Sequence, residues 1–155
     1  MNTNSICLSN IGHCNAGLIT GCDKVLMFSS EDLPNISFEK EILLPVLRAD
    51  NCSKYHATVS QKYVIYPYCS ENGKTRIYSE EELADKFPLT YSYLLSHKQV
   101  LSERKDSRTT MGEKGLWYGL VRFGKKEIFD RNKIISPGEV LNHKFCLASN
   151  PQPPS

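Results

Sequence analysis

Short apolar segments follow one another through the chain, and glycine or proline bounds or breaks most of them. Residues 63–68 combine β-branched and aromatic side chains and predict a strand that ends near Pro67. The Asn72-Gly73 dipeptide favours the positive φ angles of a tight hairpin, so residues 75–78 are expected to form the returning strand. Pro45 makes residues 42–47 a poor central strand or helix. Further short strands are expected at residues 24–28, 116–122, 133–136 and 144–148.

Two helices are expected between these strands. Ser79 and Glu82 match a capping box, in which each side chain accepts a backbone N–H of the first helical turn. Pro88 interrupts that helix, and a second helix is expected from about Leu89. Its apolar stripe would consist of Tyr91, Leu94, Leu95, Lys98 and Leu101, with the Lys98 ammonium reaching outward. A charged loop is expected to follow at residues 103–108, and a turn at residues 124–126.

Many short strands and two helices without βαβ alternation predict the α+β class, with a mixed, twisted sheet. A length of 155 residues predicts one domain, at residues 1–149, followed by an unpacked tail at 150–155. No apolar run approaches the roughly 20 residues that span a bilayer, and no secretory signal opens the chain. We therefore expect a cytoplasmic protein without a membrane partner.

Catalytic and metal-binding signatures are missing from the sequence. The cysteines form no C-x-x-C pair, and the histidines stand too far apart for helical metal spacing. Reduced, mostly buried thiols are expected, and neither a metal nor a cofactor is predicted for this chain. His13 beside Cys14 could suggest a Cys/His hydrolase, but sequence neighbours rarely form such a dyad, which makes this the weakest hypothesis.

Charge is distributed unevenly along the chain. Residues 98–133 hold ten Lys or Arg against five Asp or Glu, a net +5, while the remainder of the chain is net −3. A basic segment within a near-neutral domain indicates a surface for a polyanion. The alternative is a solvated face that only keeps the protein soluble.

Five segments in order resemble the TaqI-like C-terminal specificity domain of adenine-specific DNA methyltransferases. Gly17-Leu-Ile-Thr-Gly21-Cys-Asp-Lys24 resembles the opening of that domain, and Tyr63-Val-Ile-Tyr-Pro67 is similar to one of its strands. Cys52 stands where an aliphatic residue is more usual. The five segments are residues 11–25, 42–55, 63–67, 87–104 and 117–137.

The resemblance implies a target-recognition domain, a non-catalytic module that recognises the base sequence of double-stranded DNA. The catalytic methyltransferase domain would lie N-terminal to it in cis, or in a separate subunit. That domain would bind S-adenosylmethionine and flip the adenine out of the helix. The chain itself is therefore expected not to be an enzyme, but an excised or separately encoded part of a restriction-modification methyltransferase. The alternative is a protein-interaction domain that docks onto the catalytic subunit, with an incidental basic surface.

Candidate DNA contacts follow from the basic segment and from the resemblance. Arginine suits guanine because its planar fork meets two acceptors, while lysine suits phosphate. The candidates are Thr20, Lys24, Arg104, Lys105, Arg108, Lys114, Tyr118, Arg122, Lys125 and Lys126.

Several candidates have structural alternatives that the sequence leaves open. Arg104 could bridge to an acid within the domain, and Lys125 and Lys126 could form only a soluble turn. Thr20 could place a backbone amide against a phosphate, or belong to a sharp glycine turn. One of Trp117 and Tyr118 is expected in the core, Trp117 being the better candidate, which leaves Tyr118 for a base or sugar.

Overall fold

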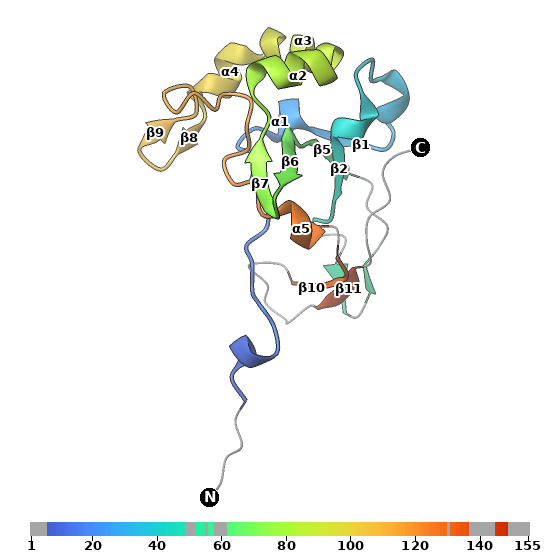
Figure 1. Cartoon of the computed structure of the whole chain (residues 1–155). Helices are drawn as coiled ribbons and strands as arrows, with labels where there is room; N and C mark the ends of the chain where they lie inside the picture. The colour runs from blue at the N-terminus through green and yellow to red at the C-terminus, as the bar shows by residue number, and fades with distance from the viewer. Residues whose placement is uncertain are drawn as a thin grey trace, which may run out of the picture.

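A three-stranded antiparallel sheet in the order β1-β5-β2 lies at the centre of the fold (Figure 1). The computed structural model describes residues 6–48, 52–54, 56–57, 62–129, 131–136 and 145–148. The strands are β1 (Met27–Ser29), β2 (Leu43–Val46) and β5 (Lys62–Ile65). Val64 and Ile65 of the central strand are fully buried. Pro45 lies on the edge strand β2, where its missing N–H leaves no gap in the ladder.

The next two strands form the predicted hairpin. β6 (Tyr68–Glu71) pairs with β7 (Lys74–Ile77), and the turn between them contains Asn72 and Gly73. Their φ angles are 51° and 72°, the left-handed conformation that the Asn-Gly dipeptide favours. The turn and the returning strand are therefore confirmed. The partner of the returning strand is β6, however, whereas the strand predicted at residues 63–68 forms β5 of the central sheet.

Three helices cover this sheet and hairpin on the upper side in Figure 1: α2 (Glu80–Lys86), α3 (Pro88–Ser96) and α4 (Lys98–Glu103). The capping box is confirmed: Ser79 Oγ accepts from the Glu82 N–H, and Glu82 accepts from the Ser79 N–H. The second expected helix is divided at His97 into α3 and α4. Leu94 and Leu101 are buried as predicted, but Leu95 is 40% exposed, because the inner face of α3 follows Thr90 and Leu94, one turn apart.

Two further small sheets lie at the opposite end of the molecule from the helices (Figure 1). β3 (Cys52–Ser53) pairs with β4 (His56–Ala57), and β10 (Lys133–Ile135) pairs with β11 (Cys146–Ala148). β4 and β11 lie against each other. The last two expected strands are thus confirmed, although Pro137 and Lys144 at their predicted ends lie outside the described residues.

Two expected strands differ in the structure. Residues 24–28 begin as a single helical turn, α1 (Asp23–Leu26), before β1 starts. Residues 116–122 form turns, and only an isolated bridge joins Arg122 to Ile19. The remaining elements are the short helices η1 (Leu8–Asn10), η2 (Leu33–Asn35), η3 (Lys40–Ile42) and α5 (Lys126–Phe129), and the strands β8 (Lys105–Asp106) and β9 (Thr109–Thr110).

The α+β class is confirmed, and its strands form several small antiparallel sheets. All six cysteines are free thiols, as expected, but only Cys52 and Cys146 are buried, while Cys7 and Cys14 are exposed. The expectation of mostly buried thiols is therefore wrong. The tail at 150–155 lies outside the described residues, so the domain limit at residue 149 stays a prediction.

Candidate nucleic-acid interface

A two-stranded hairpin, β8–β9, carries the first group of candidate cations. It replaces the charged loop expected at residues 103–108 and projects from the end of α4 (Figure 1). Ser107 at its tip has a φ of 60°, and Arg108 follows it. At its base the Met111 N–H donates to the Arg104 carbonyl at 2.8 Å. The side chains of Lys105 and Arg108 are exposed.

Lys114, a further candidate beside this hairpin, forms an ion pair with Asp106 of β8. The ion pair offsets the charge of the lysine, and it joins the segment after β9 to β8, the first strand of the hairpin. Glu113 accepts hydrogen bonds from the Thr110 N–H and hydroxyl, which fixes the same turn. Lys114 therefore contributes less free positive charge than Lys105 and Arg108 do.

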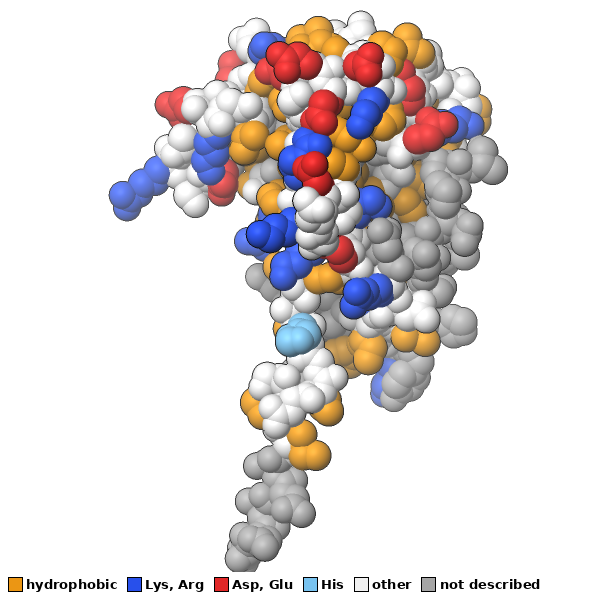
Figure 2. All heavy atoms as spheres, in the orientation of Figure 1, with side chains coloured by type: hydrophobic (Ala, Val, Ile, Leu, Met, Phe, Trp, Pro, Cys, Tyr) orange, Lys and Arg blue, Asp and Glu red, His pale blue; other side chains and the backbone are white. Residues whose placement is uncertain are grey.

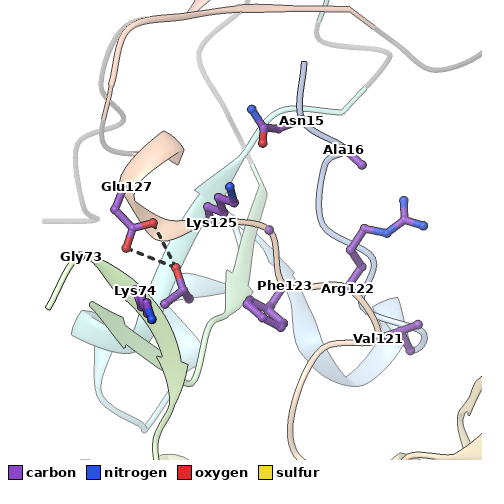
Figure 3. A pocket seen from close by; sticks show the side chains of 11 residues that line it. Asn15, Ala16, Gly73, Lys74, Val121, Arg122, Phe123, Lys125 and Glu127 are labelled. Atoms are coloured by element: carbon purple, nitrogen blue, oxygen red, sulfur yellow. Dashed lines mark hydrogen bonds between the residues drawn. The ribbon is translucent and has the colours of Figure 1, made fainter. Parts of the chain in front are cut away.

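A second group of cations lines a cavity of about 570 Å³. Three segments form its walls: the chain at Asn15, the β6–β7 turn and residues 121–127 (Figure 3). Lys74, Arg122 and Lys125 bring positive charge to the lining. The backbone of Arg122 is held in place by two hydrogen bonds with Ile19, at 2.8 and 3.0 Å. The lining includes neither a cysteine nor a histidine, so it gives no support to the Cys/His hydrolase.

The acid in the cavity lining, Glu127, is bound to neighbouring hydroxyl groups. Its carboxylate accepts from Ser70 Oγ at 2.9 Å. It also accepts from Thr75 Oγ1 at 3.3 Å (Figure 3). Its own backbone N–H and then the Ser70 hydroxyl lower the pKa of Glu127. Lys126, the neighbouring candidate, is half-buried, and its N–H donates to Thr75 Oγ1 at 2.8 Å. Lys125 is thus the exposed member of the two lysines.

Arg104 lies inside the domain, where only 7% of its surface is exposed. Its guanidinium donates to four backbone carbonyls, those of Thr20, Leu101, Trp117 and Gly119. No carboxylate of the described residues forms an ion pair with it. Burial lowers the pKa of Arg104, although a guanidinium still stays protonated. The contacts therefore support the alternative in which Arg104 has a structural role within the domain. Its partners are backbone carbonyls instead of the expected acid.

Two further candidates, Thr20 and Tyr118, are also buried. The Thr20 hydroxyl donates to Asp23 and accepts from the Cys22 N–H at 3.2 Å, so it shapes the turn before α1. Tyr118 Oη donates to the Tyr78 carbonyl at 2.7 Å. Both side chains are buried beneath the exposed cations, so we do not place them in contact with DNA.

Trp117 is buried, as predicted, next to Tyr118. Its Nε1 donates to Glu80 Oε1 at 2.9 Å, and the Lys98 ammonium lies 4.8 Å from the centre of its ring. The sequence-based prediction placed only one of these two aromatic residues in the core, because it took residues 116–122 to be a strand, in which neighbouring side chains point to opposite faces. In a turn, neighbouring side chains need not point to opposite sides.

Two groups of exposed cations are visible on one face of the molecule (Figure 2). Figure 2 shows one group of Lys and Arg side chains over the projecting hairpin and a second group beside β7 and α5. The outline of the molecule is concave between the two groups. Lys24 is exposed on α1, and no described contact joins it to either group. Lys74 was not predicted. The hairpin register could have identified it, because it follows the Asn-Gly turn directly.

No family model matches the chain. The chain is 26% identical over 121 residues to the type II methyltransferase M.BstVI of Geobacillus stearothermophilus. The alignment covers 78% of this chain but only 19% of that protein, so the chain spans about a fifth of its relative's length. This distant similarity indicates a relation to type II methyltransferases. No helix among the described residues is long and apolar enough to cross a membrane.

Proposed function

We propose that the chain is the target-recognition domain of a restriction-modification adenine DNA methyltransferase, of the TaqI-like kind, and binds double-stranded DNA. The distant similarity to a type II methyltransferase supports the class. One observation carries the DNA-binding role: five exposed or cavity-lining cations on and around the basic segment form no ion pair with a described carboxylate. They are Lys74, Lys105, Arg108, Arg122 and Lys125.

Two arginines elsewhere in the described chain are, by contrast, neutralised by acids. Arg48 pairs with Asp23 at 2.8 Å, and Arg76 pairs with Glu71 and Glu82, both at 2.6 Å. Like-charged groups that stay unpaired repel one another, so gathering them on one face lowers stability unless an anion binds there. A DNA backbone supplies such anions at a regular spacing.

The two groups of cations would share the task of binding. Lys74, Arg122 and Lys125 around the cavity would hold phosphates and fix the orientation of the duplex. The β8–β9 hairpin is a two-stranded ribbon, a kind of element that the major groove admits, and it would carry Arg108 toward the base edges. Arg104 and Thr20 would act as positioning residues below this surface.

The chemistry of methyl transfer belongs, in this proposal, to a catalytic domain outside this chain. That domain would bind S-adenosylmethionine and receive the flipped adenine. The chain would then work in the cytoplasm beside that domain, in cis or as a separate subunit, and would not be an enzyme by itself.

A fluorescence anisotropy titration with labelled duplex DNA tests the proposal. If the four cations other than Arg108 neutralise phosphates, log Kd against log salt has a slope of about 3.6 between about 50 and 200 mM salt. Arg122→Ala with Lys125→Ala should reduce the slope by about two. The matched control is Lys86→Ala, an exposed lysine on α2, which should leave it unchanged. Salt-independent binding, or no binding even beside the catalytic domain, would contradict the proposal.

A second candidate function is docking onto a catalytic subunit, and the outer face of β10–β11 favours it. Ile134 and Leu147 are directly opposite each other in the register and are 73% and 67% exposed. Phe145, two residues from Leu147, lies on the same face and is 49% exposed. Contiguous exposed apolar residues mark interaction surfaces. Ile134→Lys should weaken association with a separately produced catalytic domain and leave the salt slope of DNA binding unchanged.

A further inference from the structure

Two buried cysteines far apart in the sequence meet at the end of the molecule opposite the helices. Cys52 Sγ lies 2.8 Å from Cys146 Sγ, across a separation of 94 residues. Cys52 is 3% exposed and Cys146 1% exposed. We propose that this pair is an oxidisable dithiol, whose disulfide joins β3 to β11 and ties the two small sheets together. The proposal is independent of the proposed DNA-binding function.

The backbone pairing holds both thiols in position. Cys52 is opposite Ala57 in the β3–β4 ladder, and Cys146 is opposite Ile135 in the β10–β11 ladder. Cys52 Sγ also lies 3.8 Å from the Ile135 carbonyl, so its sulfur is held over the second ladder. A disulfide bond is about 2.05 Å long, so closing it moves the sulfur atoms by less than about 1 Å.

A metal ion is a poorer explanation of the pair. Structural zinc takes four ligands, usually cysteine and histidine. Among the described residues no group of three or more Cys, His, Asp or Glu could hold an ion. Two sulfurs in contact, without a third ligand, have the geometry of a disulfide precursor.

The oxidant that we name is a peroxide. One thiolate attacks hydrogen peroxide, the O–O bond breaks, and a sulfenic acid forms with release of hydroxide. The second thiol then attacks the sulfenic sulfur, the S–O bond breaks, and the S–S bond forms. The two thiols lose two electrons and two protons, and the peroxide leaves as two molecules of water.

The first of these steps requires a local opening. Burial, and after it the hydrogen bond from Cys52, raises the pKa of Cys146 to about 11, so thiolate is scarce at neutral pH. β3 and β4 are two residues long each, and short ladders open at low free-energy cost. We therefore expect slow oxidation, followed by rapid closure once one sulfur has reacted.

The test uses the full chain with Cys7→Ser and Cys14→Ser, which removes the exposed thiols that would crosslink molecules. The protein is treated with hydrogen peroxide, alkylated while unfolded and digested. Mass spectrometry of this otherwise wild-type protein should find a Cys52–Cys146 peptide pair in a monomer. The melting temperature should rise by several degrees and return after reduction with dithiothreitol.

Three variants distinguish this pair from incidental oxidation. Cys52→Ala and Cys146→Ala should each abolish the crosslink and the rise in melting temperature. Cys69→Ala is the matched control, a half-buried thiol on β6, and should retain both. The proposal is overturned if the crosslink joins other cysteines, or if Cys52 and Cys146 remain fully alkylated after the peroxide treatment.

Discussion

The Nη1 group of Arg104 donates a hydrogen bond to the backbone carbonyl of Thr20, which lies 84 residues earlier in the chain. On its other side, the Nη2 group of the same guanidinium donates to the carbonyls of Trp117 and Gly119. One side chain therefore joins the turn before α1 to the turns that precede Arg122 and Lys125. We therefore expect the position of the cavity cations to depend on this contact.

Arg104→Met is expected to destabilise the fold by about 3 kcal/mol, because it leaves several buried carbonyls without a donor. Arg104→Lys should recover only part of the loss, since an ammonium cannot reach carbonyls on two sides as a planar fork does. Urea unfolding measures both variants. Arg108→Ala, an exposed arginine, is the control and should stay within about 0.5 kcal/mol of the wild type. Equal unfolding midpoints for the Arg104→Met variant and the wild type would contradict the role of the guanidinium.

Gly21 provides a second test of the same contact region. Its φ is 73°, and a Cβ added there would lie 2.6 Å from Val121 Cγ2 and 3.3 Å from Arg104 Cδ. Gly73 has nearly the same φ, 72°, but no atom within 4 Å of its Cβ position. Gly73→Ala should therefore lower the free energy of unfolding only by the strain of a left-handed alanine, about 1 kcal/mol. Gly21→Ala should lower the free energy of unfolding by the same strain and by about 1–3 kcal/mol more, because the added methyl group overpacks the turn. Urea unfolding measures both variants.

Similar losses for the two glycine variants would show that the neighbouring side chains move away freely. A larger loss at Gly73 than at Gly21 would contradict the close packing of the turn against Val121 and Arg104. The comparison is informative because the two glycines share their backbone conformation and differ in their surroundings.

The sequence identified those elements whose signals are local. The Asn72-Gly73 turn and the Ser79 capping box each depend on residues within a few positions, and both were predicted. The β8–β9 hairpin was missed because its strands are only two residues long, too short for a period-two pattern. The α+β class followed from the absence of βαβ alternation, without any knowledge of strand order.

The predicted strand at residues 116–122 shows where local signals fail. Its composition favours a strand, but the carbonyls of Trp117 and Gly119 turn inward to Arg104 and cannot take part in a ladder. For the same reason the sequence placed Arg104 and Tyr118 among the DNA contacts, since burial depends on contacts distant in the chain. Lys105, Arg108, Arg122 and Lys125 are exposed, and their contact with DNA stays a prediction.

Stability should depend on pH through Glu82. The Arg76 side chain, followed by the Ser79 N–H, lowers the pKa of Glu82 from 4.5 to about 2. A carboxylate with a lowered folded pKa stabilises the protein fully above the unfolded value and loses that contribution as pH falls through the folded value. The stability gap between wild type and Glu82→Gln should therefore narrow between pH 4.5 and about 2.

Thermal melts of the two proteins across this pH range measure the gap. Glu81→Gln is the control, an exposed acid in the same helical turn for which the structure gives no hydrogen bond. Its stability difference from the wild type should be small and nearly constant. A gap for Glu82→Gln that stays constant down to pH 2 would show that the ion pair with Arg76 does not stabilise the folded state.

Arg108 at the tip of the β8–β9 hairpin should determine sequence discrimination, if the chain reads DNA as proposed. Arg108→Lys keeps the charge but loses the planar fork that meets two guanine acceptors. It should preserve the salt dependence of binding and lower the preference for the selected sequence by about 1–3 kcal/mol, roughly 5- to 150-fold. The selected sequence is first obtained by enriching wild-type binders from a pool of random duplexes.

The matched comparison is Lys125→Arg at the cavity, where a phosphate contact needs only charge. This variant should retain both the salt slope and the preference. Competition between the selected duplex and the random pool, measured by anisotropy, separates the two effects. If Arg108→Lys retains the full preference while Lys125→Arg loses it, base recognition belongs to the cavity and the hairpin only holds the backbone. If the wild type and both variants bind all duplexes equally well, the surface is a general anion site without sequence recognition.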